Sequence, residues 1–524
     1  MHTEEKTTIS PEEAESGFDA KDGPTSNSAE EDVALKIVND SYIGTISAAE
    51  ERRVVRKIDW IIMPMLIVTF MIQYIDKVIL NGAAQVGIIQ DLDLYTVQGI
   101  NPHTNEPIIN LKRFSNVTMI FYWGCLAALL PASYLAQRLP IAKFLGCTVI
   151  VWGAVVMLTV LCTGYRGFLA ARFFLGVTEC AVAPGFSIVI AMWWKKAEQP
   201  LRFSIWYTSC GFGSLVGSLL VYGIGHIHGS LQQWKYQYLI LGAATILWGL
   251  FLVVTLPDNQ TTARFFNDRE KIVSVERMRS EQTGIENKKF KLYQVKDALT
   301  DPKTWMMFFT TFSIHFVNGS VSGFGSIIVN SFGYPHLKSI LLVGATGACV
   351  VVTLIIAGAI GTYTQNTRTI VMAVVEVPVI IGSILVWKMN WSTGRGGAIT
   401  GFILLGCFAA AYMMMLALAG ANTAGHTKKA FTSGLIWCAW GISNGVAPLT
   451  IKSQEVHEHY PTCFKATIAT ACLSIFGSLS LRAYLQWQNS VRDRKFGRVD
   501  TAAALTAAFS DQTDVENSFF RYSL

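Results

Sequence analysis

Apolar residues gather in twelve runs, each long enough to cross a bilayer as a helix. A hydrophilic segment at 257–303 separates the sixth run from the seventh. The pattern therefore predicts an all-α membrane protein, with twelve transmembrane helices in two bundles of six. The predicted spans are 60–82, 115–136, 143–163, 168–194, 204–225, 236–256, 305–330, 339–361, 369–389, 397–419, 431–450 and 465–486.

The segments outside these runs define the domain organisation. Both tails are polar and are expected to be disordered, apart from a short helix near 47–57. The predicted parts are an N-terminal cytosolic tail at 1–57, a first bundle at 58–256, a cytosolic loop at 257–303, a second bundle at 304–487 and a C-terminal cytosolic tail at 488–524.

Composition agrees with a membrane protein and excludes several other classes. Only 15% of residues are charged and the mean hydropathy is +0.38, whereas soluble domains carry about 25% charged residues. The ten cysteines are scattered, without CxxC or zinc spacing, and no phosphate-binding loop or hydrolase motif occurs. We therefore expect no enzyme activity, no metal, no cofactor and no nucleic-acid partner, and a monomer in the lipid bilayer.

Lysine and arginine predict the orientation. With the N-terminus in the cytosol, 26 of them fall on cytosolic connections and flanks, against nine on the opposite side. Positive residues favour the cytosolic side. Both termini are thus predicted to be cytosolic, which requires an even number of spans, and the plasma membrane is the expected location.

The stretch 168–194 is the most informative run because it carries Arg172 and Glu179 together with Pro184. A charge near the bilayer centre costs about 2.5 kcal/mol or more, so such charges usually face a partner or a water-filled cavity. Seven residues make about two helical turns, so the two charges share one face. We expect Pro184 to kink the helix beyond Glu179.

Asp76 and Lys77 interrupt the first run. Two interpretations stay open for these charges. Asp76 could form a permanent salt bridge with Arg172 that fixes the two helices. Alternatively, the carboxylates take up protons and the cations hold an anionic substrate; arginine can grip a carboxylate with a planar fork, and lysine acts as a point charge.

The seventh run is interrupted by His315 and Asn318. An intramembrane histidine is more often a packed bundle residue than a proton relay, while Asn318 followed by glycine suggests local unwinding at a cavity. Aromatic residues that could line such a cavity are Tyr74, Tyr122, Trp206, Tyr207, Phe324 and Trp437.

Small residues spaced four apart recur in the second, fifth, eighth and eleventh runs. Such faces let helices approach closely, which suggests that these four runs meet where the two halves join. The pairs are Gly124 and Ala128, Gly213 and Gly217, Gly344 and Ala348, and Gly441 and Gly445.

Several motifs together resemble the major facilitator superfamily and, within it, the fungal allantoate permease family of the anion:cation symporter branch. They include RKIDW at 56–60, IDKVIL at 75–80, RFFLGVTECAVAPGF at 172–186 and NTAGHTKK at 422–429. The matches extend over most of the membrane domain.

The resemblance implies a rocking bundle with a central site between its halves. The resemblance assigns proton coupling to Asp76 and Glu179. It assigns the binding of an organic anion to Lys77 and Arg172. The segment 136–143 takes the place of a loop motif, with Arg138 and Lys143 as gating contacts.

We therefore expect a permease that imports a small organic anion or zwitterion, such as a vitamin, ureide, small peptide or related carboxylate, by symport with protons. The proton gradient supplies the energy. Tyr74, Tyr207, His315 and Asn318 are further candidate binding residues. A proton-driven exporter of a secondary metabolite would use the same residues, and a nutrient sensor is less compatible with such short tails.

Overall fold

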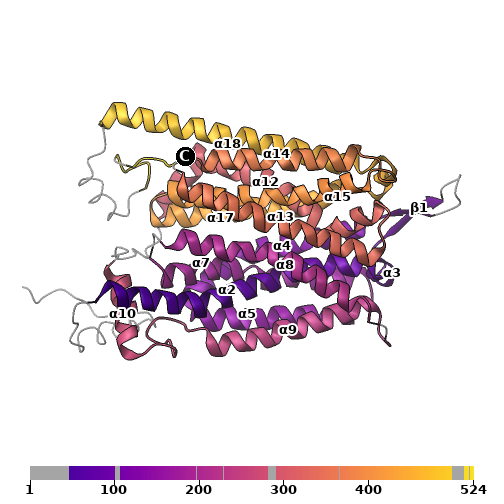
Figure 1. Cartoon of the computed structure of the whole chain (residues 1–524), viewed down its shortest axis with the longest axis horizontal. Helices are drawn as coiled ribbons and strands as arrows, with labels where there is room; N and C mark the ends of the chain where they lie inside the picture. The colour runs from indigo at the N-terminus through magenta and orange to yellow at the C-terminus, as the bar shows by residue number, and fades with distance from the viewer. Residues whose placement is uncertain are drawn as a thin grey trace, which may run out of the picture.

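The computed structural model describes residues 46–100, 107–195, 198–227, 229–280, 291–364, 366–497, 513–518 and 520–524. Its long helices run along one common axis and form two halves that lie side by side (Figure 1). The first half contains α2 (Ala48–Gln85), α4 (Lys112–Arg138), α5 (Ile141–Leu158), α6 (Tyr165–Glu179), α7 (Val182–Trp193), α8 (Gln199–Ile224) and α9 (Gln233–Thr255). The second half contains α12 (Pro302–Ser331), α13 (His336–Tyr363), α14 (Arg368–Lys388), α15 (Arg395–Leu404), α16 (Phe408–Asn422), α17 (His426–Val446) and α18 (Pro461–Phe496).

All twelve predicted runs are helical, and the fourth and tenth each consist of two consecutive helices. Within the described residues, ten segments are long and apolar enough to cross a membrane, or eleven when α12, bent by 58°, is counted as one span. The remaining run is α17, a 21-residue helix. It packs against α4 and α12 inside the bundle, so its polar residues need not face lipid.

The two ends of the bundle differ. We call the end that holds the start of α2 and the end of α18 the tail end (Figure 1). The opposite, hairpin end carries the short α3 (Ile88–Asp91) and an antiparallel pair of strands, β1 (Thr96–Ile100) and β2 (Pro107–Asn110). The predicted helix near 47–57 is confirmed, because Ser47 and Glu50 form a capping box that starts α2. Residues 1–45 lie outside the described part.

The halves meet mainly along the helix pairs α8 with α13, α4 with α17, and α2 with α12. A Cβ atom on Gly344 would lie 2.6 Å from the Cβ of Ser218, and one on Gly441 would lie 2.7 Å from Leu126. The predicted role of small residues at the seam is confirmed there. It is wrong for Gly124, Gly213 and Gly217, whose close neighbours are Phe173, Met71 and Ile75 of their own half.

Hydrogen bonds join the halves at the hairpin end. The Ser326 hydroxyl donates to the backbone oxygen of Asn81 at 2.6 Å, and His336 Nδ1 lies 2.8 Å from Gln85 Oε1. The Ser453 hydroxyl donates to the backbone oxygen of Ile109 at 2.8 Å. The rings of Phe114 and Phe324 also meet edge to face, with centroids 5.0 Å apart. The hairpin end is therefore closed.

The tail end carries two short helices of the central loop, α10 (Asp268–Ser280) and α11 (Leu292–Thr300), and the end of the chain. The predicted disorder of the C-terminal tail is wrong for its last described residues. Asp514 and Tyr522 are buried against the second half, and the Arg492 guanidinium donates to the backbone oxygens of Asp514, Asn517 and Phe520. α18 itself continues to Phe496.

Candidate functional site

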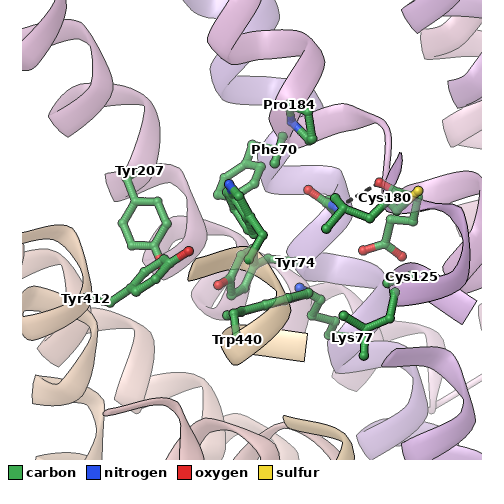
Figure 2. A pocket seen from close by; sticks show the side chains of 15 residues that line it. Phe70, Tyr74, Lys77, Cys125, Cys180, Pro184, Tyr207, Tyr412 and Trp440 are labelled. Atoms are coloured by element: carbon green, nitrogen blue, oxygen red, sulfur yellow. Dashed lines mark hydrogen bonds between the residues drawn. The ribbon is translucent and has the colours of Figure 1, made fainter. Parts of the chain in front are cut away.

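A cavity of about 40 Å³ lies between the two halves, midway along the bundle. Figure 2 shows its lining, in which Trp440 lies beside Tyr74 and Lys77 and Tyr412 lies beside Tyr207. This volume holds only a few water molecules, so a substrate would need the walls to move apart. The lining residues are Phe70, Gln73, Tyr74, Lys77, Cys125, Leu126, Leu129, Glu179, Cys180, Ala183, Pro184, Tyr207, Tyr412, Trp437 and Trp440.

Glu179 lines this cavity at the point where the helix of the fourth span is interrupted. α6 ends at Glu179 and α7 begins at Val182. In an unbroken helix the N–H of residue 184 would donate to the carbonyl of Cys180, but Pro184 has no N–H. In place of the kink that was predicted at Pro184, the structure has a short interruption at Cys180 and Ala181 within one span, Tyr165–Trp193. The Glu179 side chain is 1% exposed, and neither carboxylate oxygen has a hydrogen-bond partner among the described residues.

Lys77 is the cation of the cavity. Its ammonium lies 4.4 Å from the ring centroid of Tyr74 and 5.5 Å from that of Trp440. A cation is attracted to an aromatic face at such distances. Lys77 also lines a second cavity of about 70 Å³, which it shares with Tyr74 and Asn318. It therefore stands where the two cavities meet.

Asp76 and Arg172 are buried beside the cavity and do not line it. The indole N–H of Trp152 on α5 donates to Asp76. The guanidinium of Arg172 lies 5.1 Å from the ring centroid of Phe121. Neighbouring residues of a helix point about 100° apart, which explains why Lys77 faces the cavity and Asp76 faces α5.

The four predicted charges do not form the salt bridge that was one of the two interpretations. In the described part of the chain, no ion pair within 4.0 Å involves Asp76, Lys77, Arg172 or Glu179. One oxygen of Asp76 and the Nε of Arg172 also lack a hydrogen-bond partner there. None of the four charges is therefore neutralised by an ion pair among the described residues.

His315 and Asn318 lie on α12, in the second half. His315 is completely buried, and its ring meets the edge of Tyr412 with centroids 4.1 Å apart. It packs behind the cavity wall and lines neither cavity. Asn318 Nδ2 donates to Asn444 Oδ1 at 2.7 Å. The predicted unwinding at Asn318 is wrong, because α12 stays helical there and bends between Val321 and Gly323.

Aromatic residues supply much of the lining. The predicted Tyr74, Tyr207 and Trp437 line the first cavity, whereas Tyr122, Trp206 and Phe324 line neither. Among the lining residues that sequence reasoning missed are Phe70, Gln73, Tyr412 and Trp440. The position of Trp440, one turn from Trp437 and next to the seam residue Gly441, was a usable signal.

The loop-motif residues Arg138 and Lys143 lie at the tail end of the first half. Arg138 is exposed and lies 5.4 Å from the ring centroid of Tyr134. Asp258, which was missed, accepts hydrogen bonds from the backbone N–H groups of Ala142 and Lys143 at 3.1 and 3.3 Å. Its carboxylate also lies 3.8 Å from the Lys143 ammonium. This contact fixes the start of α5 to the segment after α9.

Comparison with known proteins gives consistent matches. The sequence profile of the Major Facilitator Superfamily matches residues 65–448. An uncharacterized transporter of Schizosaccharomyces pombe is 32% identical over 501 residues, a match that covers 95% of this chain and 92% of that protein. The allantoate permease of Saccharomyces cerevisiae is 30% identical, with 94% of this chain and 90% of the permease covered. The thiamine pathway transporter of the same yeast is also 30% identical, with coverage of 90% and 86%.

The fold is also found in a solved structure. A bacterial homolog to the human lysosomal transporter Spinster, in an inward-facing and unoccupied conformation, matches with a TM-score of 0.56. The match covers 84% of this chain and 97% of that one at 12% identity. The prediction of two six-helix bundles is thus confirmed.

Proposed function

Because the chain belongs to the Major Facilitator Superfamily and is a membrane transporter, we propose that it moves a small organic anion or zwitterion together with protons. One observation carries this proposal: Lys77 and Glu179 face the same cavity, and neither is ion-paired among the described residues. The name of one relative, allantoate permease, refers to an organic anion and agrees with it.

The two charges provide a simple coupling mechanism. An anion in the cavity is attracted by the Lys77 ammonium and repelled by an ionised Glu179 carboxylate. Such interactions are strong in an interior of low dielectric constant. The anion therefore binds best when Glu179 carries a proton, and its release favours loss of that proton. Anion and proton then cross together.

Arg172 and Asp76 form a supporting layer behind the cavity in this proposal. Arg172 precedes Glu179 by two turns of α6, or about 10 Å, and favours negative charge at that end of the cavity. Asp76 has the opposite effect beside Lys77. Together they balance the charge of the site whether or not an anion is bound.

Access alternates through rocking of the halves. The structure is closed at the hairpin end by the contacts of Asn81 with Ser326 and of Gln85 with His336. We assign the tail end to the cytosol of a cell whose plasma membrane holds the protein, following the lysine and arginine bias. In the other state the contacts at the hairpin end must separate, so that substrate enters from outside.

Transport into proteoliposomes under an imposed pH gradient tests the proposal. With labelled carboxylates outside, the wild type should accumulate an anion only when protons flow inward. Glu179→Gln should lose this accumulation and keep exchange of anion for anion, because the glutamine amide is always neutral. Asp268→Asn, at a side chain that is 99% exposed, is the matched control and should behave as wild type. Full accumulation by Glu179→Gln would refute the coupling role.

A further inference from the structure

The two halves contribute different chemistry to the central cavity. The first half supplies the charged and amide side chains, Gln73, Lys77 and Glu179, together with aromatic and aliphatic residues. The second half supplies three residues, Tyr412, Trp437 and Trp440, and all three are aromatic. A substrate with a charged end toward the first half and a ring toward the second would therefore match both walls.

The aromatic wall is built as a cluster. The rings of Trp437 and Trp440 lie 5.6 Å apart at 74°, and those of Tyr412 and Trp437 lie 6.1 Å apart at 80°. His315 supports Tyr412 from behind at 4.1 Å. Rings arranged edge to face offer both faces and edges to a further ring, which gains by stacking or by edge contact. The wall thus suits a flat ring in particular.

An aromatic wall can also attract a cation, but in this cavity the ammonium of Lys77 already occupies the cation position. The ammonium of Lys77 already lies over the rings of Tyr74 and Trp440, at 4.4 and 5.5 Å. A cationic substrate group at the same faces would be repelled by Lys77. A carboxylate beside Lys77 would instead be attracted, and it would leave the ring of the same molecule close to Trp440.

We infer that the substrate is a small carboxylate with one aromatic or heteroaromatic ring, held by its carboxylate at Lys77 and by its ring against Tyr412, Trp437 and Trp440. This rests on the proposed function and specifies its substrate class. Since the walls around the cavity of about 40 Å³ must move apart to admit any substrate, a single ring requires a smaller displacement than a fused system. Because the carboxylate contacts the first half and the ring contacts the second, the substrate also links the two halves.

Matched pairs of acids test this class without any proton gradient. Displacement of radiolabelled benzoate is measured on the purified full-length protein in nanodiscs at one fixed pH. Benzoate is compared with cyclohexanecarboxylate, and 2-furoate with tetrahydro-2-furoate, so that charge and skeleton stay constant. We expect each aromatic acid to bind about two- to tenfold more tightly than its saturated partner. Benzamide, which keeps the ring and lacks the charge, should displace benzoate poorly.

Substitutions in the aromatic wall test whether the preference for aromatic over saturated acids depends on the wall residues. Trp440→Leu should remove the preference for the aromatic acids, and Trp440→Phe should retain most of it, which separates loss of the ring contact from misfolding. Trp487→Leu, at a side chain that is 59% exposed, is the control and should leave the preference unchanged.

Two results would overturn the inference: benzoate that fails to bind, or saturated acids that bind as tightly as aromatic ones in both pairs. A preference that survives Trp440→Leu would equally refute the assigned wall. These outcomes leave proton-driven accumulation of other carboxylates untouched, so failure of the substrate class and failure of the proposed function can be told apart.

Discussion

Two groups of buried and half-buried charges differ in the partners that their side chains have. The central cluster consists of Asp76, Lys77, Arg172 and Glu179, and within the described residues it contains no ion pair. The tail-end cluster consists of Lys303 and Lys428 with their acidic partners Asp297, Asp301 and Asp514. There the Lys303 ammonium lies 2.5 Å from Asp514, and that of Lys428 lies 2.9 Å from Asp301 and 3.1 Å from Asp514.

The difference separates two uses of buried charge. Both clusters are removed from water, which costs free energy. In the tail-end cluster the ion pairs offset the free-energy cost of desolvation. They also join segments that are distant in sequence, namely the start of α12, the start of α17 and the C-terminal segment. In the central cluster no ion pair among the described residues offsets that cost, and only the hydrogen bond from Trp152 to Asp76 and the cation–π contacts of Lys77 and Arg172 reduce it. A charge without a partner is available to a substrate or a proton, so the central cluster is suited to transport and the tail-end cluster to structure.

The largest effect is expected when a tail-end lysine loses its charge. Lys303→Met keeps much of the apolar stem and leaves Asp514, whose side chain is 0% exposed, with one cation fewer. Breaking a buried pair in this way costs about 3–5 kcal/mol. Chemical unfolding in detergent measures the loss.

Lys452→Met is the control for this prediction. Lys452 pairs with Glu455 at 3.3 Å, but its side chain is 53% exposed, so the change should cost less than about 1 kcal/mol. Equal losses in the two variants would show that the tail-end cluster is not a structural element.

A smaller effect is expected from acid. Burial raises the pKa of Asp514, but the charges of Lys303 and Lys428 outweigh it and hold the pKa below its usual value. A depressed pKa stabilises the folded state above the unfolded value of about 3.9, and that contribution is lost as the pH falls through the folded value. The Tm difference between wild type and Asp514→Asn should therefore stay constant from pH 7 to about pH 4 and shrink below. A difference that closes between pH 7 and pH 5 would contradict the assigned pairing.

Much of the fold could be predicted from sequence because it depends on local pattern. Twelve apolar runs and a basic central loop predict the two halves, and charges within the runs identify α2 and α6 as the helices of the site. Asp76 was assigned to the site because it is a carboxylate inside an apolar run and because the family resemblance implies proton coupling there. The 100° step of a helix already implied that Asp76 and Lys77 could not both face one cavity.

The rest could not be predicted because it depends on contacts between distant segments. Nothing local relates Asp514 to Lys303 and Lys428, which are separated by more than 80 residues from it along the chain. The aromatic wall likewise depends on how α16 and α17 turn toward the seam. Trp437 was predicted as one of six candidate aromatics, and only the packed bundle distinguishes those that line the cavity from those that fill the core.

The smallest change in stability is expected for the same substitution in the central cluster. Lys77→Met removes a charge that has no ion pair among the described residues, and it loses the cation–π contacts to Tyr74 and Trp440. Those contacts are worth about 0.5–2 kcal/mol, and relief from burying an unpaired charge offsets them. The free energy of unfolding should therefore change by less than about 1 kcal/mol, while uptake of labelled carboxylates falls to the level of empty liposomes. Unfolding and uptake measured on one preparation check both parts. If Lys77→Met instead lost as much stability as Lys303→Met, Lys77 would be a structural residue, and the distinction between paired and unpaired clusters would fail.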